Sequence, residues 1–302
     1  MQPLLRIGMI GLDTSRAPAF TRLLHDGRHP HHVAGGRIVA GYPGGSADFD
    51  LSISRVEGIT AQLREDYGVR IMPTPEEVAE QSDAIIIESC DGRLHLEEFR
   101  RIVPYRKPVF IDKPLAVTSS DAREIARLAE VYGVPVMSCS ALRSATALTE
   151  GLQAIGGVSA VAGMDGYGPL PLETTQPGWF WYGVHTADML YRAMGRGCRT
   201  VTVRAGIDQE FLVGEWEDGR IGTLRGNRMG NDAFGAMLHT ATGTQAIDIA
   251  SHAKPYLADV LEEMLIMFRT GKGSVAIEET IEIIRFLEAA NESRSTGHTV
   301  NL

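Results

Sequence analysis

The sequence predicts an α/β half with a doubly wound parallel sheet, residues 1–140, followed by an α+β half with a largely antiparallel sheet, residues 141–302. In the first half, short continuous apolar runs alternate with helical patterns, as expected for parallel strands that helices cover on both faces. In the second half, longer strands are separated by tight turns that contain glycine, which is typical of hairpins. The length of 302 residues suits two domains that each bury a core.

The strands of the first half are expected at the apolar runs, at residues 6–11, 37–42, 84–88, 109–111 and 134–137. Between these runs, Thr74 stands at a cap position, Pro75 at the first helical position and Glu77 at the third, which predicts the start of a helix. Thr118 and Asp121 fit a second capping box, before an amphipathic helix. The first half therefore reads as a series of strand–helix–strand units.

Hairpin signals mark the second half. Residues 211–216 and 220–225 flank an Asp218-Gly219 turn between alternating apolar positions, which is a strong hairpin signal. Residues 236–240 and 244–249 repeat the pattern. An antiparallel sheet that begins near residue 158 is therefore expected.

Two helices, at residues 256–268 and 278–290, are expected to cover one face of that sheet. Strands exposed on the other face would suit a subunit interface. We therefore expect a homo-oligomer, either a dimer or a tetramer.

The composition argues against several classes of partner. The formal net charge is −9 and no basic stripe is available to neutralise phosphates, so we expect no nucleic-acid partner. No apolar run approaches the length that spans a bilayer, so we expect no membrane role. With 44% hydrophobic and 22% charged residues, the chain is typical of globular proteins, and a small uncharged or polar substrate fits best.

Cysteine and histidine usage points to no metal site and to a reduced environment. Cys90, Cys139 and Cys198 are odd in number and far apart, and the first expected strand begins too early for a secretory signal, so we expect a cytoplasmic protein. One cluster of histidines is interpreted as a solvated loop, because glycine and proline surround it and no carboxylate or thiol accompanies it. It consists of His25, His29, His31 and His32.

The most informative segment is Asp112-Lys113-Pro114-Leu115, directly after the apolar run 109–111. Ligands of open parallel sheets bind outside the carboxyl ends of the strands, so a lysine held there by proline is expected to face a ligand. The tripeptide alone would be read as a solvated turn. Its place at the mouth of a strand–helix–strand unit favours the functional interpretation.

With these features the chain resembles the Gfo/Idh/MocA family, which includes inositol dehydrogenase and glucose-fructose oxidoreductase. The resemblance rests on the strand at 6–11, on Leu94-His95, on KPVFIDKPLAVTSSDAREIARLA from residue 107, on GVHTADML from residue 183 and on the ending FLEAANESRSTGHTVNL. It implies an N-terminal Rossmann domain that binds NAD or NADP and a C-terminal substrate and oligomerisation domain. The implied reaction is hydride transfer to or from a sugar, cyclitol or related polyol.

The resemblance also implies roles for individual residues. Lys113 matches the catalytic lysine of the family, and His185 matches its histidine in the substrate domain. The expected cofactor-binding residues are Gly11, Leu12, Asp13, Thr14, Ser15, Arg16, Ser89, Cys90, Gly92, His95, Asp112, Lys113 and Pro114. The expected substrate-binding residues are Arg143, Trp179, Trp181, Tyr182, His185 and Asp188.

Two positions depart from the family pattern. Trp181 stands where the family usually has an aspartate, and an indole can stack on a sugar ring but cannot accept a proton. The phosphate loop keeps only its first glycine, and Asp13 adds a negative charge where phosphate would approach, although Thr14, Ser15 and Arg16 could compensate.

The second expected strand ends without an acidic residue for a ribose hydroxyl, which leans away from strict NAD preference; Arg55 is the nearest candidate partner for a 2′-phosphate. Three functions therefore remain open. The leading one is an NAD(P)-dependent oxidoreductase. The others are a sensor or regulator that binds a sugar or nucleotide, and a glycosidase or lyase that uses NAD without net redox change.

Overall fold

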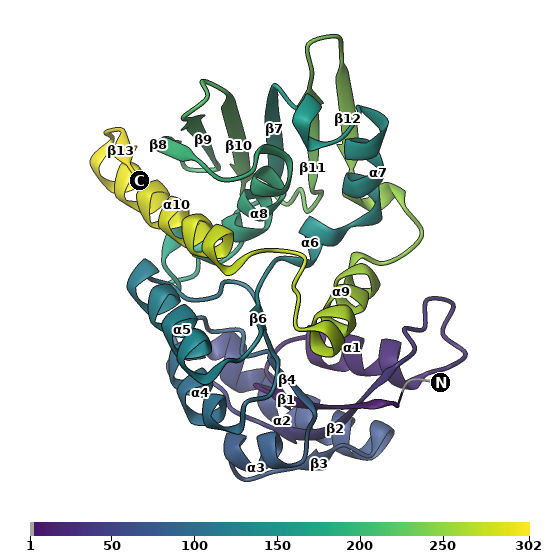
Figure 1. Ribbon diagram of the computed structural model, residues 1–302. Helices are drawn as coiled ribbons and strands as arrows, with labels where there is room; N and C mark the ends of the chain where they lie inside the picture. Colours follow the sequence, from purple (N-terminus) through teal and green to yellow (C-terminus); the bar gives the residue numbers. More distant parts are fainter. Residues whose placement is uncertain (1–2) are drawn as a thin grey trace. The chain divides into compact units, whose positions relative to one another are not determined.

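The computed structural model describes residues 3–302, which pack into two compact units (Figure 1). Unit 1 contains the chain up to Ala116, Ser120–Cys139 and Leu257–Ile277. Unit 2 contains Val117–Ser119, Ser140–Tyr256 and Glu278–Leu302. Within the described part of the chain, no helix has both the length and the apolar character needed to cross a bilayer.

Unit 1 contains a six-stranded parallel sheet in the order β3-β2-β1-β4-β5-β6. The strands are β1 (Leu5–Ile10), β2 (Gly36–Tyr42), β3 (Arg70–Ile71), β4 (Ala84–Ile87), β5 (Val109–Ile111) and β6 (Val136–Met137). The strand order reverses between β1 and β4, so the carboxyl ends of these two strands form the switch point at which such sheets bind ligands. The prediction of a doubly wound parallel sheet is confirmed; the two-residue β3 was not predicted.

The helices of unit 1 that precede β6 are α1 (Arg16–His25), α2 (Asp50–Tyr67), α3 (Pro75–Glu80), α4 (His95–Ile102), the short 3-10 helix η1 (Val103–Tyr105) and α5 (Ser119–Tyr132). The predicted start of α3 is confirmed, because Glu77 N–H donates to Thr74 Oγ1 at 3.2 Å. Gly8 in β1 lets α3 pack closely, since a Cβ there would overlap Val78 and Ser82. Local capping and close packing therefore fix this side of the sheet.

A helix from the second half of the sequence completes unit 1. Helix α9 (Tyr256–Thr270) belongs to this unit by its contacts and lies beside α1 in Figure 1. Leu265 packs against the start of β2, where Gly36 leaves space, and Arg269 Nη2 donates to the Gly35 carbonyl at 2.7 Å. The prediction that residues 256–268 cover the antiparallel sheet is therefore wrong, although the helix itself is present.

Unit 2 contains a seven-stranded mixed sheet in the order β12-β11-β7-β10-β9-β8-β13. The strands are β7 (Gly163–Pro169), β8 (Cys198–Ala205), β9 (Gln209–Trp216), β10 (Ile221–Asn227), β11 (Gly235–His239), β12 (Thr244–Asp248) and β13 (Val300–Asn301). Both predicted hairpins, β9–β10 and β11–β12, are confirmed as antiparallel pairs. The parallel pairing of β7 with β10 was not predicted, and the sheet begins at Gly163 instead of near Val158.

Helices pack on one face of this sheet. They include α6 (Ala141–Ser144), α7 (Thr146–Ala154), α8 (Gly183–Met194) and α10 (Ile277–Thr296), with the short 3-10 helices η2 (Val158–Ala160), η3 (Gly178–Phe180) and η4 (Ile249–Ser251) in the connections. Leu190 of α8 approaches Gly222, and Phe286 of α10 approaches Gly214, so glycines in β9 and β10 make room for the helices. The prediction of a helix near 278–290 is confirmed by α10.

The opposite face carries a shallow hollow of about 320 Å³, lined by Asp165, Gly166, Tyr167, Phe211, Thr223, Arg225 and Met237. The guanidinium of Arg225 lies over the ring of Phe211, at 5.3 Å from its centre. Ile221 shares the strand parity of Thr223 and Arg225 and is 53% exposed. This face therefore mixes apolar and charged side chains.

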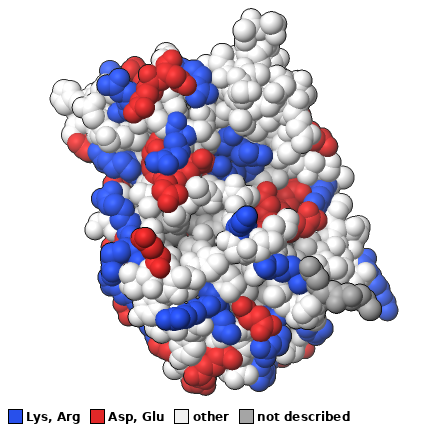
Figure 2. All heavy atoms as spheres, viewed as in Figure 1, with Lys and Arg blue, Asp and Glu red and all other residues white. Residues whose placement is uncertain are grey.

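Charges of both signs are interspersed among uncharged side chains on the face shown in Figure 2, and the upper right of this view is almost free of charge. The chain also has exposed ion pairs, such as Arg6–Asp83 and Arg127–Glu124. Exposed pairs of this kind contribute little to stability.

Candidate functional site

The loop after β1 turns sharply at Gly11. This residue adopts φ +85, and a Cβ at its position would overlap Ser89 in the loop after β4. Glycine is therefore required both for the backbone conformation and for the close approach of the two loops. The first glycine of the expected phosphate loop is thus explained by the structure.

Asp13 is fully buried and ties three segments together. Its Oδ1 accepts from Cys90 N–H at 3.0 Å, and its Oδ2 accepts from Ser52 Oγ of α2 at 2.5 Å. The sequence suggested that Asp13 stands where phosphate would approach. This interpretation is corrected, because the carboxylate instead binds the loop after β4 and helix α2. Nor does Asp13 cap α1, whose N-cap residue is Ser15.

A second network, not found from the sequence, joins the loops after β2 and β4. Ser46 Oγ donates to Asp91 Oδ2 at 2.6 Å, and Arg93 donates to both Asp91 and Asp48. These residues are separated by up to 45 positions, so no local pattern indicates the contacts. Among the described residues, Arg55 makes no hydrogen bond to this network, and its role toward a 2′-phosphate stays a prediction.

Arg16, at the start of α1, is paired with two carboxylates. Its Nε donates to Glu88 Oε1 at 3.0 Å, and its Nη2 donates to Asp112 Oδ2. Burial, with the nearby Asp112 charge, raises the pKa of Glu88 well above its usual range. The sequence interpretation that Arg16 is available to compensate phosphate charge is therefore not supported.

Lys113 directly follows Asp112 at the carboxyl end of β5, as predicted, and only 4% of it is exposed. Burial lowers the pKa of the Lys113 amine to about 8, and the positive charge of Arg16 acts in the same direction, while Asp112 partly offsets both. The peptide between Lys113 and Pro114 is cis. Lys113 is thus a buried amine that gives up its proton far more readily than a surface lysine.

His95 bridges the loops after β4 and β5. Its ring is fully buried, with Nδ1 at 2.9 Å from the Pro114 carbonyl and Nε2 at 2.8 Å from the Ser89 carbonyl. The ring therefore holds the turn that follows Lys113 against the β4 loop. The neighbouring Cys90 is buried, and burial beside Asp13 raises the pKa of its thiol, so it is not an activated nucleophile.

In unit 2, His185 lies in the first turn of α8. Its Nδ1 is 2.6 Å from Ser140 Oγ, and the ring makes edge contacts with Tyr182 and Phe234, each with 5.6 Å between ring centres. Ser140 and Phe234 were not singled out from the sequence, because they are distant from His185 along the chain. The structure brings together Tyr182 and His185, which were both expected to bind substrate.

Asp188 and Arg143 form a buried ion pair next to this histidine. Arg143 Nη1 donates to Asp188 Oδ1 at 2.9 Å, and its Nη2 donates to Glu279 at 2.5 Å. The other oxygen of Asp188 accepts from Ser140 N–H at 2.5 Å. Burial raises the pKa of Asp188, although Arg143 opposes this shift. Asp188 thus positions Ser140, and its predicted contact with substrate, like that of Arg143, stays a prediction.

The aromatic run before α8 is buried except for Tyr182, which is half-buried. Trp179 is fully buried, and its Nε1–H donates to Glu210 at 2.9 Å; Glu210 also pairs with Arg228 and Arg294. The position of Trp179 therefore does not support the prediction that it contacts substrate. Trp181, 9% exposed, makes a tilted ring contact with the half-buried Tyr182, with 5.8 Å between ring centres.

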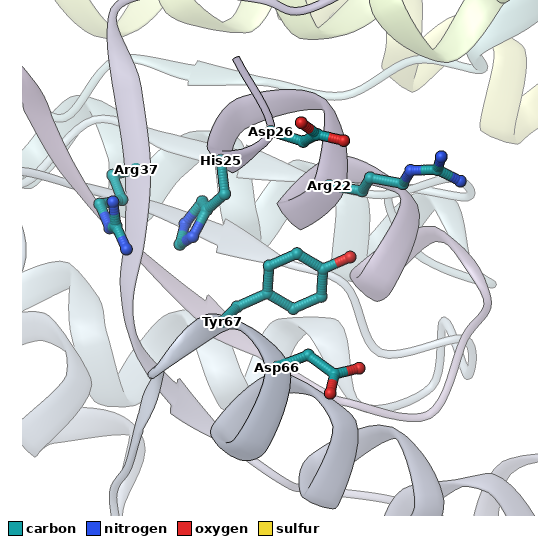
Figure 3. Close-up of a pocket in the computed structure, with 6 residues that line it drawn as sticks. All are labelled: Arg22, His25, Asp26, Arg37, Asp66 and Tyr67. Atoms are coloured by element: carbon teal, nitrogen blue, oxygen red, sulfur yellow. The ribbon is translucent and has the colours of Figure 1, made fainter. Parts of the chain in front are cut away.

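A cavity of about 400 Å³ in unit 1 is lined by Arg22, His25, Asp26, Arg37, Asp66 and Tyr67 (Figure 3). It lies at the amino end of β2, on the wrong edge of the sheet for the ligand site of a parallel α/β fold. His25 Nε2 accepts from Ile38 N–H, and burial, aided by the Arg37 charge, lowers the pKa of His25 to about 4. The histidine thus has a structural role here.

The remaining clustered histidines contact the backbone: His29 Nδ1 accepts from His31 N–H, and His32 Nδ1 lies 2.9 Å from the Leu23 carbonyl. Within residues 3–302 the structure contains no group of three or more potential ligands that could hold a metal ion.

Residues 5–139, most of the parallel-sheet unit with its strand-end loops, match the family model GFO_IDH_MocA, described as the oxidoreductase family with an NAD-binding Rossmann fold. Residues 5–139 therefore belong to the Gfo/Idh/MocA family. No curated protein sequence matches the chain significantly.

Solved structures of similar fold cover both units. GenD2 from gentamicin A biosynthesis, in complex with NAD, aligns with a TM-score of 0.78 at 14% identity, over 100% of this chain and 97% of that one. Apo scyllo-inositol dehydrogenase from Lactobacillus casei aligns with a TM-score of 0.80 at 12% identity, over 100% and 99%. Myo-inositol 2-dehydrogenase from Lactobacillus plantarum aligns with a TM-score of 0.78 at 16% identity, over 99% and 100%. At these identities the likeness concerns the fold.

The β1–α1 loop fits the phosphates of a Gfo/Idh/MocA cofactor. Gly11 provides the tight turn, and within residues 3–302 the N–H groups of Thr14 and Ser15, just before α1, donate no hydrogen bond. Such N–H groups, with the positive end of a helix, favour anions. The loop thus offers backbone and hydroxyl donors, whereas the Arg16 guanidinium is already paired.

Proposed function

We propose that the chain is an NAD(P)-dependent oxidoreductase that transfers a hydride to or from a sugar, cyclitol or related polyol. The observation that carries the proposal is Lys113, a buried amine with a pKa of about 8 at the carboxyl end of β5. An amine of this kind is suited to exchanging a proton with a hydroxyl near neutral pH. The inositol dehydrogenases and GenD2, which share the fold, support the choice of substrate class.

In the proposed reaction Lys113 accepts the hydroxyl proton of the substrate while the carbinol carbon becomes a carbonyl carbon. When bound, the nicotinamide cofactor supplies the acceptor for the hydride that leaves this carbon. His185 holds the reacting oxygen by a hydrogen bond, and Tyr182 and Trp181 offer aromatic surface to the apolar side of the ring. In the reverse direction Lys113, as the ammonium, returns the proton.

We propose that residues 11–16 would hold the cofactor together with Ser89, Cys90, Gly92 and the Asp112–Pro114 turn. Thr14 and Ser15 supply N–H and hydroxyl donors for the phosphates. Asp13 and His95 contribute indirectly. Asp13 holds the loop after β4, and His95 holds the loops after β4 and β5. Both NAD and NADP are compatible with this arrangement, because β2 ends at Tyr42 and Pro43 follows, without an acidic residue.

A second candidate is a protein that binds a sugar or nucleotide without turning it over. Trp181 favours this alternative. It stands where members of the Gfo/Idh/MocA family usually have an aspartate, and an indole cannot accept a proton. Both candidates predict polyol binding, but only the first predicts net redox change.

We further propose that the chain forms a homo-oligomer through the open face of the unit 2 sheet. Its mixed surface, with Phe211, Met237 and Ile221 beside Arg225 and Asp165, resembles the composition of interfaces between subunits. A partner's sheet would remove these apolar side chains from water.

The full chain, incubated with NAD or NADP and a panel of inositols, aldoses and sugar acids, tests the proposed function. Reduced cofactor should form in proportion to the polyol oxidised, and samples without polyol should form none. Calorimetric binding of a polyol without turnover would support the binding protein instead. Hydrolysis or elimination with no net change in cofactor would identify a non-redox enzyme, and either result would contradict the dehydrogenase.

A further inference from the structure

The surroundings of His185 determine which ring nitrogen carries the proton. Ser140 Oγ lies 2.6 Å from His185 Nδ1, and the same oxygen accepts from Leu142 N–H at 3.1 Å. A serine hydroxyl has one hydrogen to donate and two lone pairs that accept. The direction of the 2.6 Å hydrogen bond therefore decides the tautomer of His185.

Ser140 is fully buried, so its hydroxyl hydrogen cannot turn to solvent. Among the described residues, His185 Nδ1 is the acceptor within hydrogen-bonding distance of this hydroxyl. If Nδ1 carried the proton, the serine hydrogen would be a buried donor without an acceptor, which is unfavourable. If Ser140 donates to Nδ1, every polar atom of the serine is satisfied.

We infer that Ser140 is a positioning residue that fixes neutral His185 with its proton on Nε2, so that His185 can donate a hydrogen bond to a substrate oxygen but cannot accept its proton. The part that concerns substrate rests on the proposed oxidoreductase function. The tautomer itself rests only on the contacts of Ser140. No role of this kind follows from the sequence, because 45 residues separate the two side chains.

A buried ion-pair network holds Ser140 in place for this purpose. Its N–H donates to Asp188, which pairs with Arg143, and Arg143 pairs with Glu279 of α10. Asp188 is one helical turn after His185, so α8 carries both the histidine and the residue that anchors its partner. This arrangement explains why Asp188 is bound to Ser140 and not to the imidazole.

His185 and Lys113 then have different roles in the proposed reaction. A histidine with Nε2–H stabilises negative charge on the reacting oxygen, and the proton must then go to another group. In the proposed reaction that group is Lys113. His185 would hold the oxygen in both directions of the reaction without changing its own protonation.

Nuclear magnetic resonance of the full chain labelled with ¹⁵N-histidine tests the tautomer without substrate or cofactor, and the His185→Asn variant assigns the signal. We expect Nδ1 of His185 to be the unprotonated nitrogen. In Ser140→Ala the Nδ1–H form should become detectable, and Ser140→Thr should restore the original form. Ser144→Ala is the matched control, because Ser144 is a buried serine of α6 whose hydroxyl has no partner within residues 3–302.

An Nδ1–H tautomer in the wild-type chain would overturn the inference, even if Ser140→Ala failed to fold. So would a tautomer that Ser140→Ala leaves unchanged. If a polyol substrate is found, Ser140→Ala should lower kcat by about two- to tenfold, the worth of one hydrogen bond, with a smaller change in KM. A confirmed tautomer together with no turnover on any polyol would contradict the proposed function alone.

Discussion

Four charged side chains share one buried cluster at the carboxyl ends of β4 and β5. Arg16 is paired with Glu88 and Asp112, and Lys113 directly follows Asp112 in the chain. Buried charges of one sign are costly unless opposite charges compensate them. Burial, the largest effect, and the Arg16 charge lower the pKa of Lys113 and favour its neutral form, while Asp112 and Glu88 partly oppose them. At this scale, the electrostatics of a few residues set the chemistry that the chain can perform.

The pH dependence of turnover should report this cluster. Since the pKa of Lys113 is lowered to about 8, its neutral form, which accepts the proton in alcohol oxidation, is depleted as the pH falls below that value. We therefore expect kcat/KM for oxidation to rise about tenfold per pH unit below pH 8 and to level off above it. The rate of the reverse reduction should fall above the same pH. A rate that still rises toward pH 10.5, the value of an ordinary lysine, would contradict this assignment.

Asp13 provides a second test at the residue scale. Because its carboxylate holds Cys90 N–H and Ser52 Oγ, we expect Asp13→Gly to lower the free energy of unfolding by about 1–3 kcal/mol and to weaken dinucleotide binding. Urea unfolding and cofactor titration measure the two effects. Asp26→Gly, at the other end of α1, should change neither by a comparable amount. Tighter cofactor binding in Asp13→Gly would show that the carboxylate obstructs the phosphates after all.

At the scale of elements, local signals were predictable and long-range contacts were not. The Thr74 cap of α3 and the Gly219 turn between β9 and β10 depend on neighbours a few positions away, and both are present as predicted. The parallel pairing of β7 with β10, and the packing of α9 in unit 1, join segments far apart in the sequence. Periodicity indicates that a helix is amphipathic, but not which sheet it will cover.

The candidate site follows the same rule. Lys113 and His185 were predicted because strand-end position and family motif single them out. Their properties depend on tertiary structure: burial and the nearby Arg16 charge lower the pKa of Lys113, and Ser140 contacts His185. No spacing in the sequence encodes those contacts.

Two adjacent residues of α9 test where this helix packs. Leu265 is 6% exposed and contacts the start of β2, whereas Ile266 is 58% exposed. Leu265→Ala should lower the free energy of unfolding by about 2–5 kcal/mol, as for other buried leucines, while Ile266→Ala should cost less than about 0.5 kcal/mol. Denaturant unfolding followed by circular dichroism measures both. Equal effects would argue against the docking of α9 on unit 1.

At the scale of the whole molecule, the two units supply different parts of the proposed enzyme. Unit 1 has the switch point of a parallel sheet, where the family binds NAD, and the buried Lys113. Unit 2 has His185 on α8, held by Ser140, and an open sheet face suited to another subunit. The family membership and the buried amine together favour redox chemistry over mere binding.

The open sheet face predicts the oligomeric state. Ile221→Glu combined with Met237→Glu places two charges on this face, so the double variant should elute as a smaller species than the wild-type chain. Light scattering coupled to chromatography measures the mass. Ile207 lies in the β8–β9 turn and is 92% exposed. The control variant Ile207→Glu should therefore leave the mass unchanged. A wild-type chain that is monomeric at all concentrations would contradict the proposed interface.

The turnover number of Lys113→Met, compared with that of Lys107→Met, tests the central claim most directly. Both lysines precede a proline, but Lys107 stands before β5 and Lys113 after it. If Lys113 is the proton-transfer residue, Lys113→Met should lower kcat by about 10²–10⁴-fold with nearly unchanged cofactor affinity, and Lys107→Met should keep full activity. Full turnover in Lys113→Met would contradict the account, because the buried amine would then be a structural residue only.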